Sequence, residues 1–272
     1  MAQTIAVLSQ KGGTGKTTTV RTLTDAFRRV GLNVLAVDLD PQANLSDYLG
    51  VESDATPTIA DVLAGRAAAR EAVRGGVIPA DLALAETELA LGGRLGRELA
   101  LRRALAEVSP DFDLVLIDCP PSLGLLTVNA LVAADHALLS AEAQYFALQG
   151  VEQALELIEL ARDTLNPGLA VIGILLNIAD MRTRHSREAL EALRAHYPQQ
   201  LLSTPIRASI AYAESAQRAA SILDLRPDLG ADYLAVAAEL LGRLGLAGAR
   251  QRMRRLAREL SAGPAAPPAV EG

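Results

Sequence analysis

The stretch Gln10-Lys-Gly-Gly-Thr-Gly-Lys-Thr-Thr18 decides the fold. It holds the only two lysines of the chain, Lys11 and Lys16, whereas all the other basic side chains are arginines. Arginine carries a wide planar fork, but lysine carries a compact ammonium that fits beside a phosphate in a tight backbone loop. Lysine at these two places alone therefore indicates a phosphate-binding loop.

The residues on either side support this interpretation. The apolar run Thr4–Leu8 predicts a buried strand before the loop, and a helical pattern begins at Lys16. Glycines let backbone N–H groups turn toward phosphate oxygens, and the helix points its positive end at the same anion. This order of strand, loop and helix is that of a P-loop. Lys16 would then bridge the β- and γ-phosphates of ATP, and the Thr17 hydroxyl would ligate Mg²⁺.

Other short apolar runs predict an α/β fold, with a mostly parallel central sheet covered by helices on both faces. The expected strands are 4–8, 34–38, 114–118, 136–140 and 171–176. The expected helices are 16–30, 58–64, 94–108, 150–165, 186–197, 211–218 and 231–244. We expect one ATPase domain over residues 1–248, a basic helix over 249–261 and a disordered tail rich in proline and alanine over 262–272.

Composition excludes several classes of protein. The net charge of −6 argues against a protein that coats nucleic acid over its whole surface, so any DNA contact must come from a local arginine patch. Cys119 is the only cysteine, which excludes a disulfide framework and a cluster of cysteine ligands within one chain. We find neither a signal peptide nor a run of about 18 apolar residues, so we expect a cytoplasmic protein without membrane spans.

Three aspartates lie where ligands bind in open α/β sheets. Asp38 and Asp40 flank Leu39 at the carboxyl end of a predicted strand, and residues two apart share a face. Asp118 ends another apolar run, as expected for a carboxylate that holds Mg²⁺ through water. The alternative is that Asp38 or Asp118 only caps a loop. Cys119 is expected to be a small buried residue rather than a nucleophile.

The loop resembles the deviant Walker A motif of the ParA/MinD group of P-loop ATPases, with Gln10 where the ordinary pattern has glycine. Segment 37–46 resembles switch I of ParA/Soj proteins, and segment 113–122 resembles their Walker B and switch II. Weaker similarity continues through segments 144–150, 177–183 and 206–214. The resemblance covers roughly residues 1–245 and is strongest in the first fifty and around Asp118.

The resemblance implies a role for each site residue. Lys11 would cross a dimer interface to the partner's ATP, Asp40 would orient the attacking water, and Asp38 would support the phosphate and metal shell. Asn177 would pair with the adenine edge, although an ordinary asparagine at a strand end is an equal alternative. The implied catalytic residues are Lys11, Lys16 and Asp40, and the implied metal site is formed by Thr17, Asp40 and Asp118. The implied nucleotide contacts are Lys11, Gly12, Gly13, Thr14, Gly15, Lys16, Thr17, Thr18, Asp38, Asp118 and Asn177.

The resemblance also implies a function. Proteins of the ParA/Soj type partition chromosomes or plasmids: ATP closes a sandwich dimer, the dimer binds nonspecific DNA on the nucleoid, and a ParB-like partner stimulates slow hydrolysis. Because the first predicted strand starts near the first residue, we expect no N-terminal helix-turn-helix domain. The candidate DNA contacts are Arg182, Arg184, Arg187, Arg218 and Arg243, with Arg194 and Arg207 nearby. The alternative for each is a solvated arginine in an arginine-rich chain.

Two other functions remain open. A MinD-like ATPase binds membrane through an amphipathic helix, and Met253, Leu256 and Leu260 could form one apolar stripe on the basic helix. That stripe is thin and lacks an aromatic residue, so we favour a helix that extends the DNA surface or continues the last helix. A P-loop metabolic ligase is the second alternative, but such enzymes share the Asp-Pro-Gln switch less closely.

Overall fold

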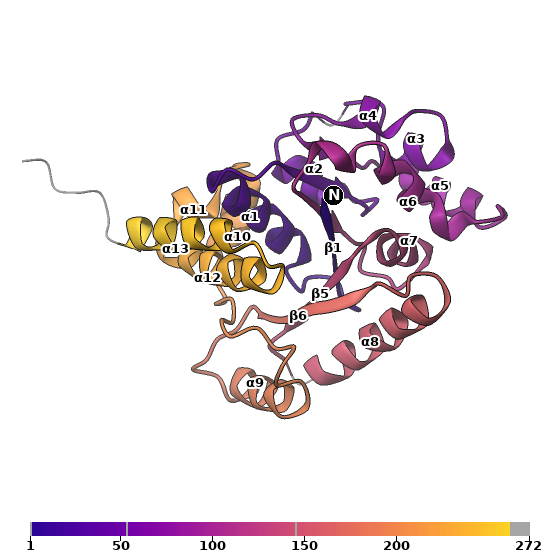
Figure 1. The fold of residues 1–272 in the computed structure, drawn as a ribbon. Coiled ribbons are helices and arrows are strands. Elements are labelled where there is room, and N and C mark those ends of the chain that lie inside the picture. Colours follow the sequence, from indigo (N-terminus) through magenta and orange to yellow (C-terminus); the bar gives the residue numbers. More distant parts are fainter. Residues whose placement is uncertain (1, 53, 145, 262–272) are drawn as a thin grey trace, which may run out of the picture.

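The computed structural model describes residues 2–52, 54–144 and 146–261 (Figure 1). Six strands form one parallel sheet in the order β3-β2-β4-β1-β5-β6. The fold class and all five expected strands are confirmed. The additional strand, β3, has only two residues and lies at the sheet edge, too short to produce a sequence pattern. The strands are β1 (Gln3–Leu8), β2 (Val34–Asp38), β3 (Val77–Ile78), β4 (Leu114–Asp118), β5 (His136–Glu142) and β6 (Ala170–Asn177).

Alternate residues of each strand feed two separate cores, one on each face of the sheet. In β1, Ala6 and Leu8 face one core whereas Ile5 and Val7 face the other. Both sets are fully buried, which explains why the strands are apolar throughout. One face is covered by α3 (Ile59–Ala64), α4 (Ala69–Ala72), α5 (Ala83–Leu91), α6 (Ala100–Ala106), α7 (Leu125–Ala133), α8 (Ala147–Thr164) and α9 (Arg184–His196). The other is covered by α1 (Lys16–Arg29), α2 (Asn44–Tyr48), α10 (Ala211–Gln217), α11 (Ile222–Leu225), α12 (Pro227–Arg243) and α13 (Ala247–Ser261).

The strand register brings the predicted site residues to one edge of the sheet. Asp38 at the end of β2 pairs with Asp118 at the end of β4, and Asp118 also lies opposite Val7 of β1. The phosphate loop leaves β1 one residue later, at the same edge. On the other side of β1, Asn177 at the end of β6 pairs with Glu142 of β5. The sheet therefore gathers residues that are far apart in the chain.

Some helices differ from the sequence prediction. The helix expected over 94–108 is a 3-10 turn at Arg97–Leu99 followed by α6, because Gly96 adopts a left-handed conformation (φ +67°) just before it. The sequence pattern did not predict α7, whose buried residues include Leu126, Asn129 and Leu131, and which lacks a clear polar face. An all-round buried helix has no amphipathic period to detect.

The basic helix expected over 249–261 is present as α13, which packs along α12. Its apolar stripe is used inside the protein: Met253 is fully buried, and Leu256 and Leu260 pack against the same core. Within the described residues, no helix is long and apolar enough to cross a membrane. The predicted tail over 262–272 lies outside the described residues.

Candidate functional site

The phosphate loop is closed by a chain of hydrogen bonds. The Ser9 hydroxyl donates to the Lys11 carbonyl oxygen (2.8 Å), and the Thr14 hydroxyl donates to Ser9 Oγ (2.8 Å). From β5, the Ser140 hydroxyl donates to the Thr14 carbonyl oxygen (2.7 Å). These short bonds fix the loop before any ligand is bound. Thr14, predicted as a nucleotide contact, turns its hydroxyl into the loop, where it serves this network.

Lys16 lies at the centre of the loop. Its Nζ donates to Ser9 Oγ (3.1 Å) and to the Lys11 carbonyl oxygen (3.2 Å), and only 5% of the residue is exposed. Burial lowers the pKa of Lys16, and the neighbouring Asp118 charge acts in the opposite direction. The loop therefore holds an ammonium that is poorly solvated and lies within the electrostatic influence of Asp118 and Asp40.

Gly15 is required at its position for two reasons. Its φ of +81° is left-handed, and an added Cβ would lie 2.6 Å from Nδ2 of Asn177. The same Asn177 nitrogen donates to Thr19 Oγ1 (3.1 Å), to Ser140 Oγ (3.3 Å) and weakly to the Gly15 carbonyl oxygen (3.4 Å). Asn177 thus ties β6 to the loop. It also lines the cleft described below, and its contact with adenine remains a prediction.

The Asp38 carboxylate is hydrogen-bonded to the loop that follows β2. It accepts hydrogen bonds from the Ser46 hydroxyl (2.7 Å), the Ser46 amide (2.9 Å) and the Asp40 amide (3.1 Å). Burial raises the pKa of Asp38 to about 6, although these hydrogen bonds act against the shift. Asp38 therefore holds the segment between Asp40 and Ser46 in place from inside the protein.

Asp118 is a buried acid whose charge is offset only by the nearby Thr17 hydroxyl and Lys16 ammonium among the described residues. It is 1% exposed, and within the described residues neither of its carboxylate oxygens has a hydrogen-bond partner. Burial and the Asp38 charge raise the pKa of Asp118, while Thr17 and Lys16 act in the opposite direction. A buried carboxylate without a partner is costly unless a cation compensates for it.

Cys119 follows Asp118 directly. It is fully buried, and burial raises the pKa of its thiol, so Cys119 is no nucleophile.

The residues present fit a Mg²⁺ ion that is bound mainly by ATP. Within the described residues, no three His, Cys, Asp or Glu side chains form a metal site by themselves. P-loop magnesium needs no such cluster, because phosphates, waters and one hydroxyl supply most ligands. Thr17 would provide the hydroxyl, and Asp118 would hold the ion through one of its water ligands. Bound Mg²⁺ would neutralise charge that develops on the phosphates.

The loop opens on a cleft of about 740 Å³. Asp40 faces this cleft, and its carboxylate accepts a hydrogen bond from the Gln42 amide (3.0 Å). The inner wall consists of predicted residues: Gly12, Gly13, Gly15, Lys16, Thr17, Thr18, Asp40 and Asn177. The outer wall includes Tyr48, Ser209, Tyr212 and Tyr233, which the sequence did not predict. It also includes Arg207, which the sequence analysis named only beside the candidate DNA contacts. These residues follow no motif, and only the weak similarity over 206–214 pointed to some of them.

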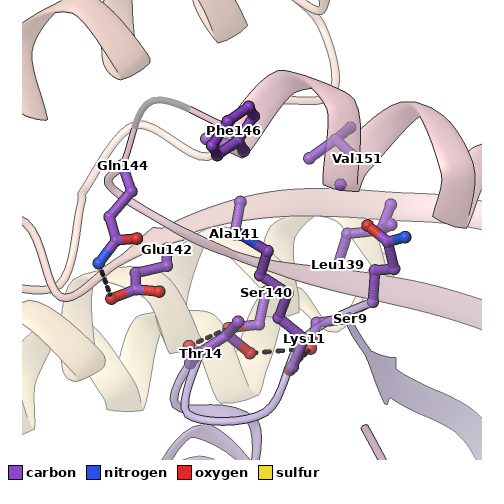
Figure 2. A pocket seen from close by; sticks show the side chains of 13 residues that line it. Ser9, Lys11, Thr14, Leu139, Ser140, Ala141, Glu142, Gln144, Phe146 and Val151 are labelled. Carbon is purple, nitrogen blue, oxygen red and sulfur yellow. Dashed lines mark hydrogen bonds between the residues drawn. The ribbon is translucent and has the colours of Figure 1, made fainter. Parts of the chain in front are cut away.

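Lys11 does not line this cleft. Its exposed side chain lies on another pocket, which is shown in Figure 2, and its Nζ is 5.2 Å from the centroid of the Phe146 ring. Gln10 points the same way, since its Oε1 lies 3.7 Å from where a Cβ on Gly150 of α8 would be. The side chains of Gln10 and Lys11 therefore lie next to α8, whereas Gly12, Gly13 and residues 15–18 line the cleft.

The candidate DNA contacts do not form one cluster. Arg182, Arg184, Arg187 and Arg194 lie on or just before α9, whereas Arg218 follows α10 on the other face of the sheet. Arg182 pairs with Asp180 (2.8 Å) and Arg184 with Glu188 (2.6 Å).

Two other arginines are held within the chain. The Arg243 guanidinium donates to the carbonyl oxygen of Ile172 (2.8 Å) and pairs with Glu239 (2.8 Å), which favours a structural role. Arg207 pairs with Asp232 (2.7 Å) at the mouth of the cleft.

Comparison with known proteins decides the family. A model of the AAA domain matches residues 2–171. The chain is 36% identical to Soj, the sporulation initiation inhibitor protein of Bacillus subtilis, over 88% of this chain and 98% of that protein. It is 37% identical to the chromosome partitioning protein ParA of Caulobacter vibrioides, over 88% of this chain and 94% of that protein. The chain belongs to the ParA/Soj family of partitioning ATPases.

A solved structure shares this fold. The chain resembles a Mycobacterium smegmatis protein, described as cobyrinic acid a,c-diamide synthase, with a bound ATP analogue and magnesium. The TM-score is 0.72 and the identity 41%, over 80% of this chain and 93% of that chain. The family, the fold and the ATPase class predicted from the ParA/Soj motifs are thus confirmed.

Proposed function

We propose that this ParA/Soj-family ATPase partitions a chromosome or plasmid through a nucleotide-dependent homodimer. Each subunit binds ATP with Mg²⁺ in the cleft of the phosphate loop. The ATP-bound dimer binds nonspecific DNA at the nucleoid, and hydrolysis stimulated by a ParB-like protein returns the subunits to the monomeric state. ATP is thereby used to switch binding to a surface on and off.

The position of the two lysines carries this proposal. Lys16 is buried in its own loop beside Asp118, whereas Lys11 is exposed and lies outside its own cleft. An ammonium that is fixed to the motif but turned away from its own nucleotide is available to a nucleotide in another subunit. Without that second charge the phosphoryl group lacks part of its stabilisation, which accounts for the expected slow basal hydrolysis.

The DNA surface is proposed on the exposed arginines. Arg187, Arg194 and Arg218 are exposed, and no carboxylate of the described chain forms an ion pair with them. A two-fold dimer doubles any such set, so a few per subunit provide several phosphate contacts. Arg182 and Arg184 are also exposed, but they would have to exchange their present acidic partners for phosphates.

The alternatives are less well supported. A MinD-like membrane helix needs an exposed apolar stripe, but the stripe of α13 packs on the core. The synthase named for the Mycobacterium smegmatis structure matches 80% of this chain, whereas the partitioning proteins match 88% of it.

The test is a paired binding assay. With ATP and Mg²⁺, we expect salt-sensitive binding to random-sequence duplex DNA, which is lost with ADP and in the Lys16→Ala variant. The affinity should fall steeply as salt increases, because each phosphate contact releases a counterion. Binding to anionic vesicles in place of DNA would contradict the proposal. The control is Arg243→Gln, which should change DNA binding little, since Arg243 is held inside the chain.

A further inference from the structure

The side chain of Lys11 has a defined resting place in the monomer. Its Nζ lies 5.2 Å from the centroid of the Phe146 ring, within the distance at which a cation is attracted to an aromatic face. Both side chains border the same pocket, between the phosphate loop and the start of α8 (Figure 2). Within the described residues, no carboxylate lies within ion-pair distance of Lys11. The ring is therefore the group that attracts this charge.

The backbone on each side of the contact is fixed. The Lys11 carbonyl oxygen accepts hydrogen bonds from Ser9 Oγ (2.8 Å) and Lys16 Nζ (3.2 Å). The Phe146 carbonyl oxygen accepts the Gly150 amide (3.1 Å) in the first turn of α8. Any release of Lys11 from the ring is therefore a change of side-chain rotamer, which needs no rearrangement of the loop.

We propose that Phe146 is a positioning residue that holds Lys11 in the resting subunit and opposes premature pairing. The inference rests on the proposed role of Lys11 at the partner's nucleotide. When the dimer closes, the side chain of Lys11 must leave the ring and extend across the interface. Two such contacts are lost each time a dimer forms. The contact with the ring therefore increases the fraction of subunits that must have ATP bound before dimers form.

The size of the effect follows from the exposure of the contact. Phe146 is 53% exposed, and a cation–π contact at such a site favours the held position by roughly 2.3- to 5.4-fold. Because two contacts are lost per dimer, removing the ring should tighten the dimer by roughly five- to thirtyfold. Nucleotide affinity of the monomer should not change, because Phe146 does not line the cleft.

The experiment compares wild type, Phe146→Leu and Phe146→Tyr. Leucine keeps an apolar side chain without a π face, and tyrosine keeps the face. Sedimentation velocity with Mg²⁺ and a non-hydrolysable ATP analogue gives each dimer dissociation constant. We expect Phe146→Leu to pair five- to thirtyfold more tightly than wild type and Phe146→Tyr to match wild type within about twofold. Pairing of Phe146→Leu that is equal to or weaker than wild type overturns the proposal.

A second readout tests the contact without dimerisation. Reductive methylation with ¹³C labels the lysines, and the chain has only Lys11 and Lys16, which Lys11→Arg tells apart. In the nucleotide-free monomer, the aromatic ring should shift the methyl protons on Lys11 upfield, and Phe146→Leu should abolish this shift. Equal spectra for the two proteins overturn the inference. Failure of wild type to pair with ATP would instead contradict the proposed function, while this spectral difference still decides whether the contact exists.

Discussion

At the scale of single residues, the site depends on how closely Asn177 approaches the phosphate loop. Gly15 combines a left-handed backbone with contact to the Asn177 amide, so both its conformation and its lack of a side chain matter. The motif in the sequence predicts glycine here for phosphate binding. The structure adds a second reason, since the end of β6 occupies the space where a side chain would be.

We expect Gly15→Ala to abolish measurable ATP binding, because the new methyl group would displace Asn177 and the loop network that it supports. Titration calorimetry with ATP and Mg²⁺ gives the affinity. The matched control is Gly31→Ala at the end of α1, which has a similar φ (+77°) but open space around it. It should lower the free energy of unfolding by about 1–2 kcal/mol and leave ATP affinity unchanged. Equal loss of ATP binding in both variants would contradict this account.

A second prediction at this scale concerns pH. The pKa of Asp38 is raised to about 6, whereas an unfolded aspartate has a pKa of about 3.9. The folded chain therefore binds this proton more tightly, so the contribution of Asp38 to stability is full below about pH 4 and is lost as pH rises toward 6. Asp118 shifts in the same direction. Urea unfolding of the nucleotide-free protein should show a smaller fall in stability over this range for Asp38→Asn than for wild type. Parallel profiles would show that Asp38 does not titrate in this window.

At the scale of elements, every strand except the two-residue β3 could be predicted from sequence, because each is a short apolar run buried on both sides. The helix α7 was not predicted, because it has no polar face that would give an amphipathic pattern. The helix expected over 94–108 was too long at its start, because Gly96 interrupts it before α6. The membrane alternative arose from the stripe on α13, and a stripe that packs on the core looks the same in sequence as one that faces lipid. Only the tertiary structure shows which surface covers it.

We expect Met253→Ala to destabilise the protein by about 2–5 kcal/mol, as for other fully buried large apolar side chains cut to alanine. The neighbouring Arg254→Ala, at an exposed position of the same helix, should change stability by less than about 0.5 kcal/mol. Urea unfolding measures both. A small effect at Met253 together with vesicle binding by the wild type would mean that α13 leaves the core to bind membrane.

At the scale of the whole molecule, the inner wall of the cleft could be predicted and the outer wall could not. The loop, Asp40 and Asp118 belong to contiguous motifs whose spacing reflects phosphate chemistry. Tyr48, Tyr212 and Tyr233 meet only because α2, α10 and α12 cover the same face of the sheet. The roles of the arginines could not be predicted either. The sequence does not show that the Arg243 guanidinium is hydrogen-bonded to the backbone at Ile172, whereas Arg187 is exposed.

Pairing of two subunits through Lys11 is the central claim, and sedimentation velocity of hydrolysis-deficient protein tests it most directly. Asp40→Ala should retain ATP binding, because Asp40 faces the cleft without holding the phosphate loop, and should accumulate as a dimer with ATP and Mg²⁺. Asp40→Ala combined with Lys11→Ala should bind ATP with similar affinity yet sediment as a monomer. A dimer that persists in the double variant, or a single variant that stays monomeric with ATP bound, would contradict the claim.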